Sequence, residues 1–592
     1  MFELKPENLA QLVNAAMGKI ENDLVFVNCK VLNVFTKEFL PANVYVYDKW
    51  ISHVEYDVKT ALLPVKKIYD GQGKFLCPGF VDAHVHIESS LLTPQNYART
   101  VVPLGTTTVL EDAHEIGNVM GKEGIRYMLE NAQELPMRQL MTVPSCVPSV
   151  PGFENSKTAL TAPDYDELFK EEGVIGLGEI MDYEGVINNE NRIHNIIKKG
   201  KEYHAYLQGH APLVKGQRLS AYLCAGPSSD HEAKKADEII EKYRKGMWID
   251  VRDGNTSRNM QSIIPALKEV GNFERICFSS DDRRCNVTLK EGHMDGIVRN
   301  AVSCGMPVIE ALISASYRVA LEAKIERLGA IAPGYIADLL TLHDLESLKV
   351  EDVFFEGKQV SSKGNLIAEV PSSDCTRYAV EDTLSEVEYS EKDFSIYVKN
   401  KEKVKLNYMA YESYTSSVSE LKQAEFKVID GKVSLEGHEG KMFVAVFNRY
   451  GNKCKSIAVV DKFGIDHGAL ASSVGHDSHN ITIVFDTVEN GYQAMKQLMK
   501  QSGGFCAVEN GEVIAEFPLP IAGLMSKDSA EDVARQLELM VKANQQLGNC
   551  YLENPVSRIT ILSLLVCPYV KISDMGMVDT EKKQWISTIC EE

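Results

Sequence analysis

Two histidines that could bind a metal ion lie inside an apolar stretch of the sequence. His84 and His86 belong to "PGFVDAHVHIESS", residues 78–90. Because side chains alternate in a strand, both rings share one face with Asp82. Neutral imidazole is a common metal ligand. A single histidine here would be an ordinary core residue, but two on one face predict a metal site.

Four further potential ligands end later apolar segments. Glu179 ends "GLGEI", and His210, His231 and Asp281 end "QGH", "SSDH" and "FSSD". With the histidine pair they supply four imidazoles and two carboxylates, which exceeds the four ligands of one tetrahedral zinc ion. We therefore predict two divalent metal ions bridged by Glu179. The donor set suits Mn²⁺, Fe²⁺ or Zn²⁺, and we expect Mn²⁺.

These ligands need a scaffold that brings the ends of strands together. Eight predicted strands alternate with helical segments, at residues 79–86, 106–114, 138–146, 173–180, 204–210, 226–231, 247–254 and 275–282. This α/β pattern and its length are typical of a (β/α)8 barrel, in which active sites lie at the carboxyl ends of the strands.

The residue composition and the hydrophobic pattern change several times along the chain. We predict an N-terminal helix and the first part of a small β-sandwich at 1–79, the barrel at 80–328, and the second part of the sandwich at 329–370. An acidic, Ser-rich linker at 371–400 then leads to a C-terminal α+β domain at 401–592. The small β domain is therefore built from both flanks of the barrel.

Composition restricts the partners of the chain. Its 592 residues carry a net charge of -20, which argues against a nucleic-acid partner. The N-terminus lacks the features of a signal peptide. The apolar run 559–570, about 12 residues, is shorter than the roughly 20 needed to cross a membrane, and we predict a buried strand there. Scattered cysteines indicate free thiols in a reducing compartment. We expect a cytoplasmic homodimer that binds a small molecule and no membrane.

The motifs resemble those of the amidohydrolase superfamily and, within it, of the bacterial adenine deaminases. The resemblance rests on "PGFVDAHVHIESS", "GTTTVLEDAHEIGNVMG", "AYLCAGPSSDHE" and "GAIAPGYIADL". "GALASSVGHDSHNI" and "EFPLPIAGLMS" extend it to the C-terminal part. It implies a (β/α)8 barrel with a binuclear metal centre that deaminates adenine to hypoxanthine and ammonia, a reaction of purine salvage.

The resemblance also implies roles for individual residues. Glu179 would bridge the metals, where many relatives use a carboxylated lysine. We expect Asp281 to be both a metal ligand and the general base. Further candidates for contacts with the substrate or with the ligands are Asp112, His114, Glu115, Asp282, His293, His476 and His479.

Several of these candidates have an equally plain structural interpretation. His114 and Glu115 follow the second strand, where they would orient the substrate, relay protons or cap a helix. His293 would line the pocket or begin a salt-bridged helix. Strand alternation predicts that Asp282 points to the face opposite Asp281.

The C-terminal histidines allow two interpretations. His476 and His479 lie three residues apart in "GHDSHN" and could bind a metal. We favour instead a polar turn that folds over the barrel mouth and helps to exclude water.

Loops near the predicted site differ from the pattern of adenine deaminases. The second strand is followed by Asp112-Ala113-His114-Glu115, where the family has Asp-Pro-His-Glu. An alternative function is therefore that of a paralogous binuclear amidohydrolase acting on another aminopurine or a cyclic amide. A binding protein on an inactive barrel is a third possibility, which the retention of all six ligand positions disfavours.

Overall fold

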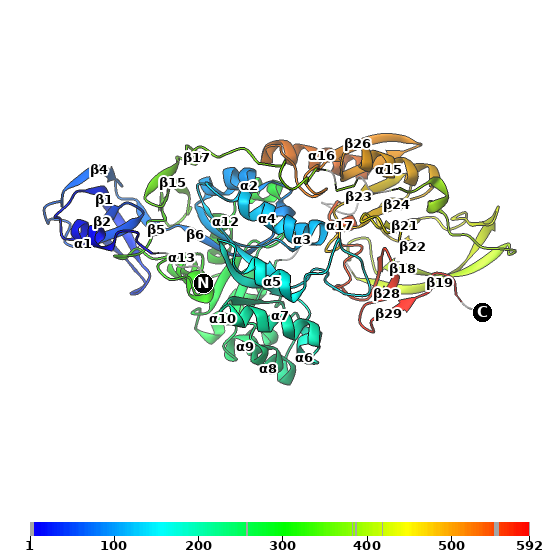
Figure 1. Cartoon of the computed structure of the whole chain (residues 1–592), viewed down its shortest axis with the longest axis horizontal. Helices are drawn as coiled ribbons and strands as arrows, with labels where there is room; N and C mark the ends of the chain where they lie inside the picture. Colours follow the sequence, from blue (N-terminus) through cyan, green and yellow to red (C-terminus); the bar gives the residue numbers. More distant parts are fainter. Residues whose placement is uncertain are drawn as a thin grey trace.

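The chain forms an elongated molecule in the computed structural model, which describes residues 5–255, 258–381, 383–384, 388–416, 418–549 and 556–590. Figure 1 shows a β-rich part at one end, drawn in blue and green, and a central α/β part. A second β-rich part, yellow to red, lies at the other end.

Strands from both flanks of the central part join in one mixed sheet. This nine-stranded sheet has the order β17-β16-β15-β14-β5-β1-β2-β3, with β4 on β1. Its strands are β1 (Asn22–Asn33), β2 (Glu38–Tyr47), β3 (Trp50–Glu55), β4 (Val65–Asp70), β5 (Phe75–Pro78), β14 (Leu339–Leu342), β15 (Val350–Phe355), β16 (Lys358–Ser362) and β17 (Asn365–Leu366). The predicted sandwich thus takes the form of a single hydrogen-bonded sheet, preceded by helix α1 (Leu9–Ala16).

A strand lies in each of the eight segments expected in the central part. They are β6 (Phe80–Val85), β7 (Thr106–Asp112), β8 (Arg138–Pro144), β9 (Val174–Ile180), β10 (Tyr206–Gly209), β11 (Ser229–Asp230), β12 (Trp248–Arg252) and β13 (Ile276–Ser279). All pairings among them are parallel, within a five-stranded sheet, β10-β9-β8-β7-β6, and a three-stranded sheet, β11-β12-β13. The two sheets meet where Val85, in β6, forms a parallel bridge with Asp281, beyond β13.

Helices connect and cover these strands. They are α2 (Pro94–Val101), α3 (His114–Met120), α4 (Lys122–Asn131), α5 (Ala162–Leu168), α6 (Tyr183–Ile187), α7 (Asn191–Glu202), α8 (Gly216–Ala225), α9 (Ala236–Arg244), α10 (Met260–Val270), α11 (Cys285–Glu291), α12 (Met294–Ser303), α13 (Val308–Ser314) and α14 (Tyr317–Glu322). Short 3₁₀ turns lie at η1 (Ile87–Ser90), η2 (Val102–Leu104) and η3 (Glu391–Phe394). Because helices cover parallel strands, β6, β7 and β8 are buried along their whole length.

A second large sheet forms the C-terminal part. Its order is β20-β19-β18-β22-β21-β24-β23-β25-β26. The elements are β18 (Lys403–Tyr411), β19 (Ser419–Ile429), β20 (Lys432–Val433), β21 (Lys441–Phe447), β22 (Lys455–Asp461), β23 (Ala469–Ser472), β24 (Ile481–Phe485), α15 (Val488–Lys500), β25 (Gly504–Glu509), β26 (Glu512–Pro518), α16 (Ala530–Gln546), α17 (Val556–Thr560), β27 (Val570–Ser573), β28 (Gly576–Asp579) and β29 (Gln584–Ile586).

The prediction of a buried strand at residues 559–570 is wrong. The end of α17 and a series of turns occupy this run, and β27 begins only at Val570. Apolar content alone does not distinguish a short strand from a buried helix end. No helix in the described ranges is both long and apolar enough to cross a membrane.

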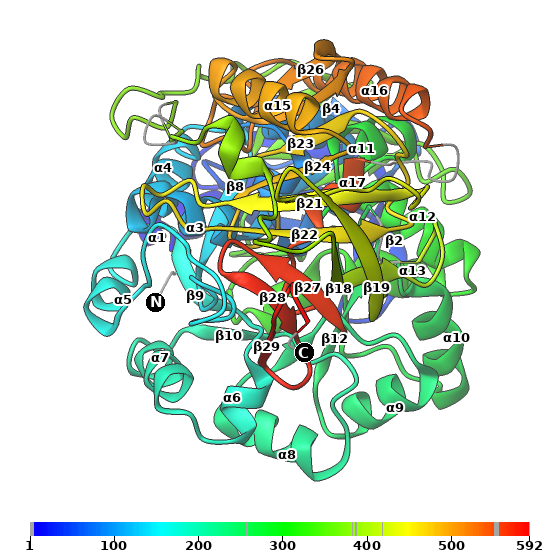
Figure 2. The same cartoon turned by 90° about the vertical axis from the view of Figure 1, so that its right-hand side faces the viewer.

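The C-terminal part packs against the carboxyl ends of the parallel strands. Figure 2 looks onto this part, with helices α5 to α10 arranged around its lower half. Asn155, between β8 and α5, donates a hydrogen bond of 2.7 Å to Asp574, between β27 and β28. Ser149 hydrogen-bonds Asp477, between β23 and β24. The end of the α/β part that carries the predicted ligands is therefore covered.

Candidate metal centre

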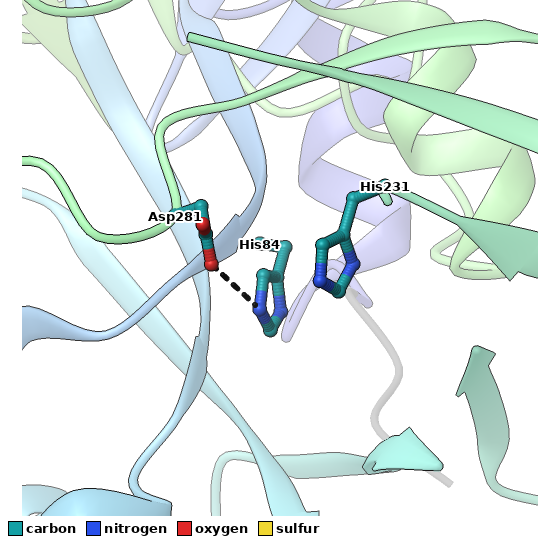
Figure 3. A group of neighbouring side chains, drawn as sticks. All are labelled: His84, His231 and Asp281. Atoms are coloured by element: carbon teal, nitrogen blue, oxygen red, sulfur yellow. Dashed lines mark ion pairs between the residues drawn. The ribbon is translucent and has the colours of Figure 1, made fainter. Parts of the chain in front are cut away.

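The structure brings all six predicted ligands together at the carboxyl ends of the parallel strands. His84 lies in β6, His86 and His231 directly follow β6 and β11 by one residue, and Glu179 lies in β9. His210 follows β10, and Asp281 lies two residues beyond β13. Figure 3 shows His84 between His231 and Asp281. Their donor atoms form overlapping groups in which all atoms lie within 4.8 Å of one another.

Glu179 lies between two pairs of histidines. Its Oε1 is 3.5 Å from Nε2 of His86 and 4.0 Å from Nε2 of His84. Its Oε2 is 2.5 Å from Nδ1 of His210 and 3.1 Å from Nε2 of His231. One carboxylate thus presents one oxygen to each pair, which is the arrangement that a bridging ligand requires.

Neighbouring groups determine which nitrogens of the first pair can bind a metal. Nε2 of Gln208 donates to the carbonyl of Ala83, so its Oε1 accepts a hydrogen bond of 2.8 Å from Nδ1 of His84. Nδ1 of His86 donates to the carbonyl of Asp112 at 2.8 Å. Both Nε2 atoms therefore face the cluster and carry lone pairs when the rings are neutral, as in metal-binding histidines held by a second hydrogen bond.

The same geometry tests whether a metal ion fits. Nε2 of His84 and Nε2 of His86 are 3.1 Å apart. Burial opposes a charge on His86, but Asp281 and Glu179 outweigh it and raise its pKa well above the usual range, so a proton lies between the two nitrogens in the absence of an ion. A bound cation would replace this proton. Oδ1 of Asp281 is 3.4 Å from each of the two nitrogens, so a carboxylate oxygen completes the group. These residues fit a divalent cation, because the buried carboxylates of Glu179 and Asp281 carry negative charge that needs a counter-ion.

The electrostatics favour the ligand forms of the carboxylates. Burial opposes ionisation of Glu179, but His210 and His231 outweigh it and hold its pKa well below the usual range. Burial likewise opposes ionisation of Asp281, but Arg252, His84 and His86 hold its pKa well below the usual range. Burial lowers the pKa of His84, so its imidazole stays neutral. Ionised carboxylates and neutral imidazole are the states that bind metals.

Asp112 and His114 lie directly behind this cluster. Oδ2 of Asp112 accepts a hydrogen bond of 2.5 Å from the backbone N–H of Glu179. Nδ1 of His114 is 3.6 Å from Oδ1 of Asp112 and 3.8 Å from Oε1 of Glu179. Asp112 therefore holds the backbone of Glu179, while the ring of His114 faces the centre.

Glu115 connects the cluster with the C-terminal part. Nδ1 of His476 and Nε2 of His479 both contact its carboxylate, one on each oxygen. Nε2 of His114 lies 3.5 Å from Oε1 of Glu115 and 3.7 Å from Oδ1 of Asp477. The turn that bears the two histidines therefore reaches the mouth of the parallel strands, as expected for a covering segment.

Asp282 lies where strand alternation did not place it. Asp282 stays beside the centre, grouped with His86 and Asp281, and its Oδ1 accepts a hydrogen bond of 2.7 Å from Ser89. The expectation that Asp282 points to the opposite face is wrong, because β13 has already ended and Asp281 has a φ of 52°.

His293 is not brought to the cluster. Its Nε2 lies 2.9 Å from the hydroxyl of Tyr97 and its Nδ1 lies 2.8 Å from Oγ1 of Thr106. It is the residue that precedes α12, and burial lowers its pKa to about 3. His293 therefore stands at a helix start, but its neutral ring is held by hydrogen bonds to hydroxyl groups instead of the expected salt bridge.

Sequence reasoning missed three residues that hold the ligands. Gln208 orients His84, and Arg252 forms an ion pair with Oδ2 of Asp281. Nζ of Lys242, fully buried in α9, donates to the carbonyl of Ala211 at 2.6 Å and to Asp230 at 2.9 Å. A usable signal existed for Arg252, which ends the seventh strand as the ligands end theirs.

Comparisons with known proteins match the central and the C-terminal part of the chain. The model of the amidohydrolase family matches residues 75–360, and that of the adenine deaminase C-terminal domain matches residues 416–584. The adenine deaminase of Clostridium acetobutylicum is 36% identical over 96% of this chain and 98% of its own. Adenine deaminase 2 of Carboxydothermus hydrogenoformans is 36% identical, covering 97% and 98%. The adenine deaminase of Thermosipho africanus is 33% identical, covering 98% and 99%.

Proposed function

The chain belongs to the adenine deaminase family of amidohydrolases, and from this membership we infer that it hydrolyses the exocyclic C–N bond of adenine to give hypoxanthine and ammonia. Similarity over nearly the whole length, including the C-terminal domain, carries this inference. Glu179 lies between two histidine pairs and presents one carboxylate oxygen to each, which supports a binuclear hydrolase. We place the reaction in purine salvage.

We propose that the six clustered residues hold two divalent cations. His84, His86 and Asp281 would hold one, His210 and His231 the other, and Glu179 both. When bound, such ions make water acidic enough to react near neutral pH and neutralise charge that develops in the transition state. Mn²⁺ is the proposed metal, and Fe²⁺ and Zn²⁺ suit the same ligands.

Asp281 is the proposed general base. Its Oδ1 faces the cluster, and its lowered pKa keeps it ionised, so it can accept a proton from a water held there. The water oxygen adds to C6 of adenine, and the electron pair of the C6–N1 double bond moves to N1. Asp281 then passes the first water proton to the amino group, the C6–N bond to that group breaks, and ammonia leaves. The second water proton passes from the oxygen to N1 as the C6 carbonyl forms, and hypoxanthine remains.

We assign the exclusion of bulk water to the C-terminal turn with His476 and His479. Its contacts with Glu115 bring a separate part of the chain over the reacting position. A covered site strengthens every charge interaction within it. Neither histidine is proposed as a metal ligand, because both already contact Glu115.

We further propose that the eight parallel strands close into a (β/α)8 barrel. The bridge between Val85 and Asp281 supports closure. The proposed domains are those expected from the sequence: the flanking β domain at 1–79 and 329–370, the barrel at 80–328, the linker at 371–400 and the C-terminal domain at 401–592. A cytoplasmic location is supported by free thiols at all described cysteines. We propose a homodimer as the working assembly.

Ammonia release across a panel of purines and pyrimidines tests the function. Protein loaded with Mn²⁺ should release ammonia from adenine with one equivalent of hypoxanthine, and chelation should abolish the reaction. Release from another aminopurine, with adenine inert, would refute the assigned substrate while leaving the hydrolytic centre in place.

A further inference from the structure

Arg252 makes ion pairs with acidic residues on both neighbouring strand ends. It is the last residue of β12, and its side chain is 10% exposed. Nε pairs with Oδ2 of Asp281, and Nη1 pairs with Oε1 of Glu232. Nη2 lies 3.8 Å from Oδ2 of Asp282. One guanidinium group therefore contacts residues beyond both β11 and β13.

The backbone alone does not determine the direction of the Asp281 side chain. Regular pairing ends at Ser279, and Asp281 has a φ of 52°, in the left-handed region. Its N–H donates to the carbonyl of His84 at 2.9 Å, which fixes the backbone but leaves the carboxylate free to rotate. Arg252 takes Oδ2, so Oδ1 is the oxygen that faces His84 and His86.

Glu232 extends the arrangement to the other histidine pair. It directly follows His231, whose Nε2 is 3.1 Å from Glu179. The contact with Arg252 therefore ties the strand end that carries His231 to the one that carries Asp281. A planar guanidinium with several fixed donors can hold two carboxylates in this way, whereas a lysine ammonium is a point charge.

We propose that Arg252 is a positioning residue: it fixes the rotation of the Asp281 carboxylate and, through Glu232, the spacing between the two halves of the metal centre. This role of Arg252 rests on the proposed function in one respect, the use of Asp281 as metal ligand and general base. Arg252 acts through these carboxylates: its ion pairs are with Glu232, Asp281 and Asp282 and not with the histidines.

Two substitutions and a control test the role. Arg252→Ala removes the guanidinium, and Arg252→Lys keeps the charge without the planar group. Arg258→Ala is the control, because Arg258 also pairs with acidic residues, Asp253 and Glu291, but is 41% exposed. The readouts are metal retained per chain after dialysis against a chelator, and kcat and KM for adenine. Guanidinium ion and its neutral analogue urea are added to Arg252→Ala below unfolding concentrations.

We expect metal affinity to fall about tenfold to a hundredfold in Arg252→Ala, as for other residues that orient metal ligands. We also expect kcat to fall about a hundredfold, because small misplacement of a reacting group has this effect. KM should stay near the parent value, guanidinium but not urea should restore part of kcat, and Arg258→Ala should match the parent.

Three results would overturn the role. A raised KM with unchanged kcat would mean that Arg252 binds substrate. Parent-like kcat and metal retention in Arg252→Ala would mean that the carboxylates are positioned without it. If that variant does not fold, parent-like behaviour of Arg252→Lys would refute the need for a guanidinium. An inactive parent would refute the proposed function instead, and metal retention would still decide the role of Arg252.

Discussion

The contact of His476 and His479 with Glu115 predicts that catalysis depends on the C-terminal turn. The double substitution His476→Ala/His479→Ala removes both contacts and leaves the six ligands untouched. We expect metal content close to that of the parent and weaker turnover of adenine. The reason is that Glu115, with a side chain only 2% exposed, would remain buried with His114 as its remaining histidine neighbour.

The magnitude follows from the burial of Glu115. Burial opposes its ionisation, but His476, His479 and His114 outweigh it and hold its pKa well below the usual range. Removing one partner of a buried ion pair costs about 3–5 kcal/mol. The lower bound corresponds to about a hundredfold in the equilibrium between covered and open site. We therefore expect kcat/KM to fall by about this factor if chemistry requires the covered site.

The pH dependence gives a second readout of the same contact. Burial lowers the pKa of His476, but the carboxylates of Glu115, Asp282 and Asp477 outweigh it and raise the pKa from 6.5 to about 9. A raised pKa stabilises the covered site fully below pH 6.5, and this contribution is lost as the pH rises through about 9. The shift corresponds to about 3 kcal/mol. kcat/KM of the parent should therefore decline as the pH rises from 6.5 to about 9 and level off above it, and His476→Gln should lack this decline.

The assay is adenine deamination from pH 6 to 10 with metal content measured on the same samples. His467→Ala is the matched control, because His467 pairs with Asp466 and Glu509 in the same part of the chain but is 43% exposed. A double variant that deaminates adenine like the parent would refute the covering role. Loss of metal would show that these histidines are ligands and that the six-residue centre is incomplete.

The other predictions concern the metal centre. His84→Ala and His86→Ala should each lower bound divalent metal and activity together, and full activity of the double variant would exclude this site. Asp281→Asn should lower kcat by about a thousandfold, through loss of a general base, whereas Asp282→Asn should be much milder; the reverse ranking would assign the base to Asp282. Gln208→Leu should weaken metal binding by about tenfold to a hundredfold, measured by chelator competition, because the ring of His84 loses its orienting acceptor.

The strands and the clustering of the candidate ligands were predictable because each depends on local sequence. Apolar segments with turn residues at both ends predicted the eight parallel strands, and a structure element lies in each. Alternation placed His84 and His86 on one face, as the 3.1 Å between their Nε2 atoms requires. Alternation failed at Asp282, since the strand had ended and a positive φ at Asp281 turned the chain.

The C-terminal contact with Glu115 was predictable only in outline. The polar, Gly-containing turn around His476 and His479 suggested a loop rather than a core, and its family context suggested the barrel mouth. Its partner could not be named, because Glu115 and His479 are 364 residues apart. Contacts over such distances depend on how two sheets pack, which local patterns do not encode. The apolar run 559–570 failed for a related reason, since its length suits a strand and a helix end equally.

The residues that hold the ligands show why a ligand count from sequence is an incomplete description of this centre. Lys242 is fully buried and donates to Asp230 and to Ala211, the neighbours of His231 and His210. Burial opposes its charge, but Asp230 and Glu238 outweigh it and raise its pKa, so the ammonium stays protonated. Arg252 performs the corresponding task beside Asp281. Each half of the centre thus has one buried cation on an adjacent element. Lys242 acts through Asp230 and the carbonyl of Ala211, and Arg252 acts through carboxylates. The proposed metal ligands would be held at short range in this way before any ion binds, which is what a preorganised site requires.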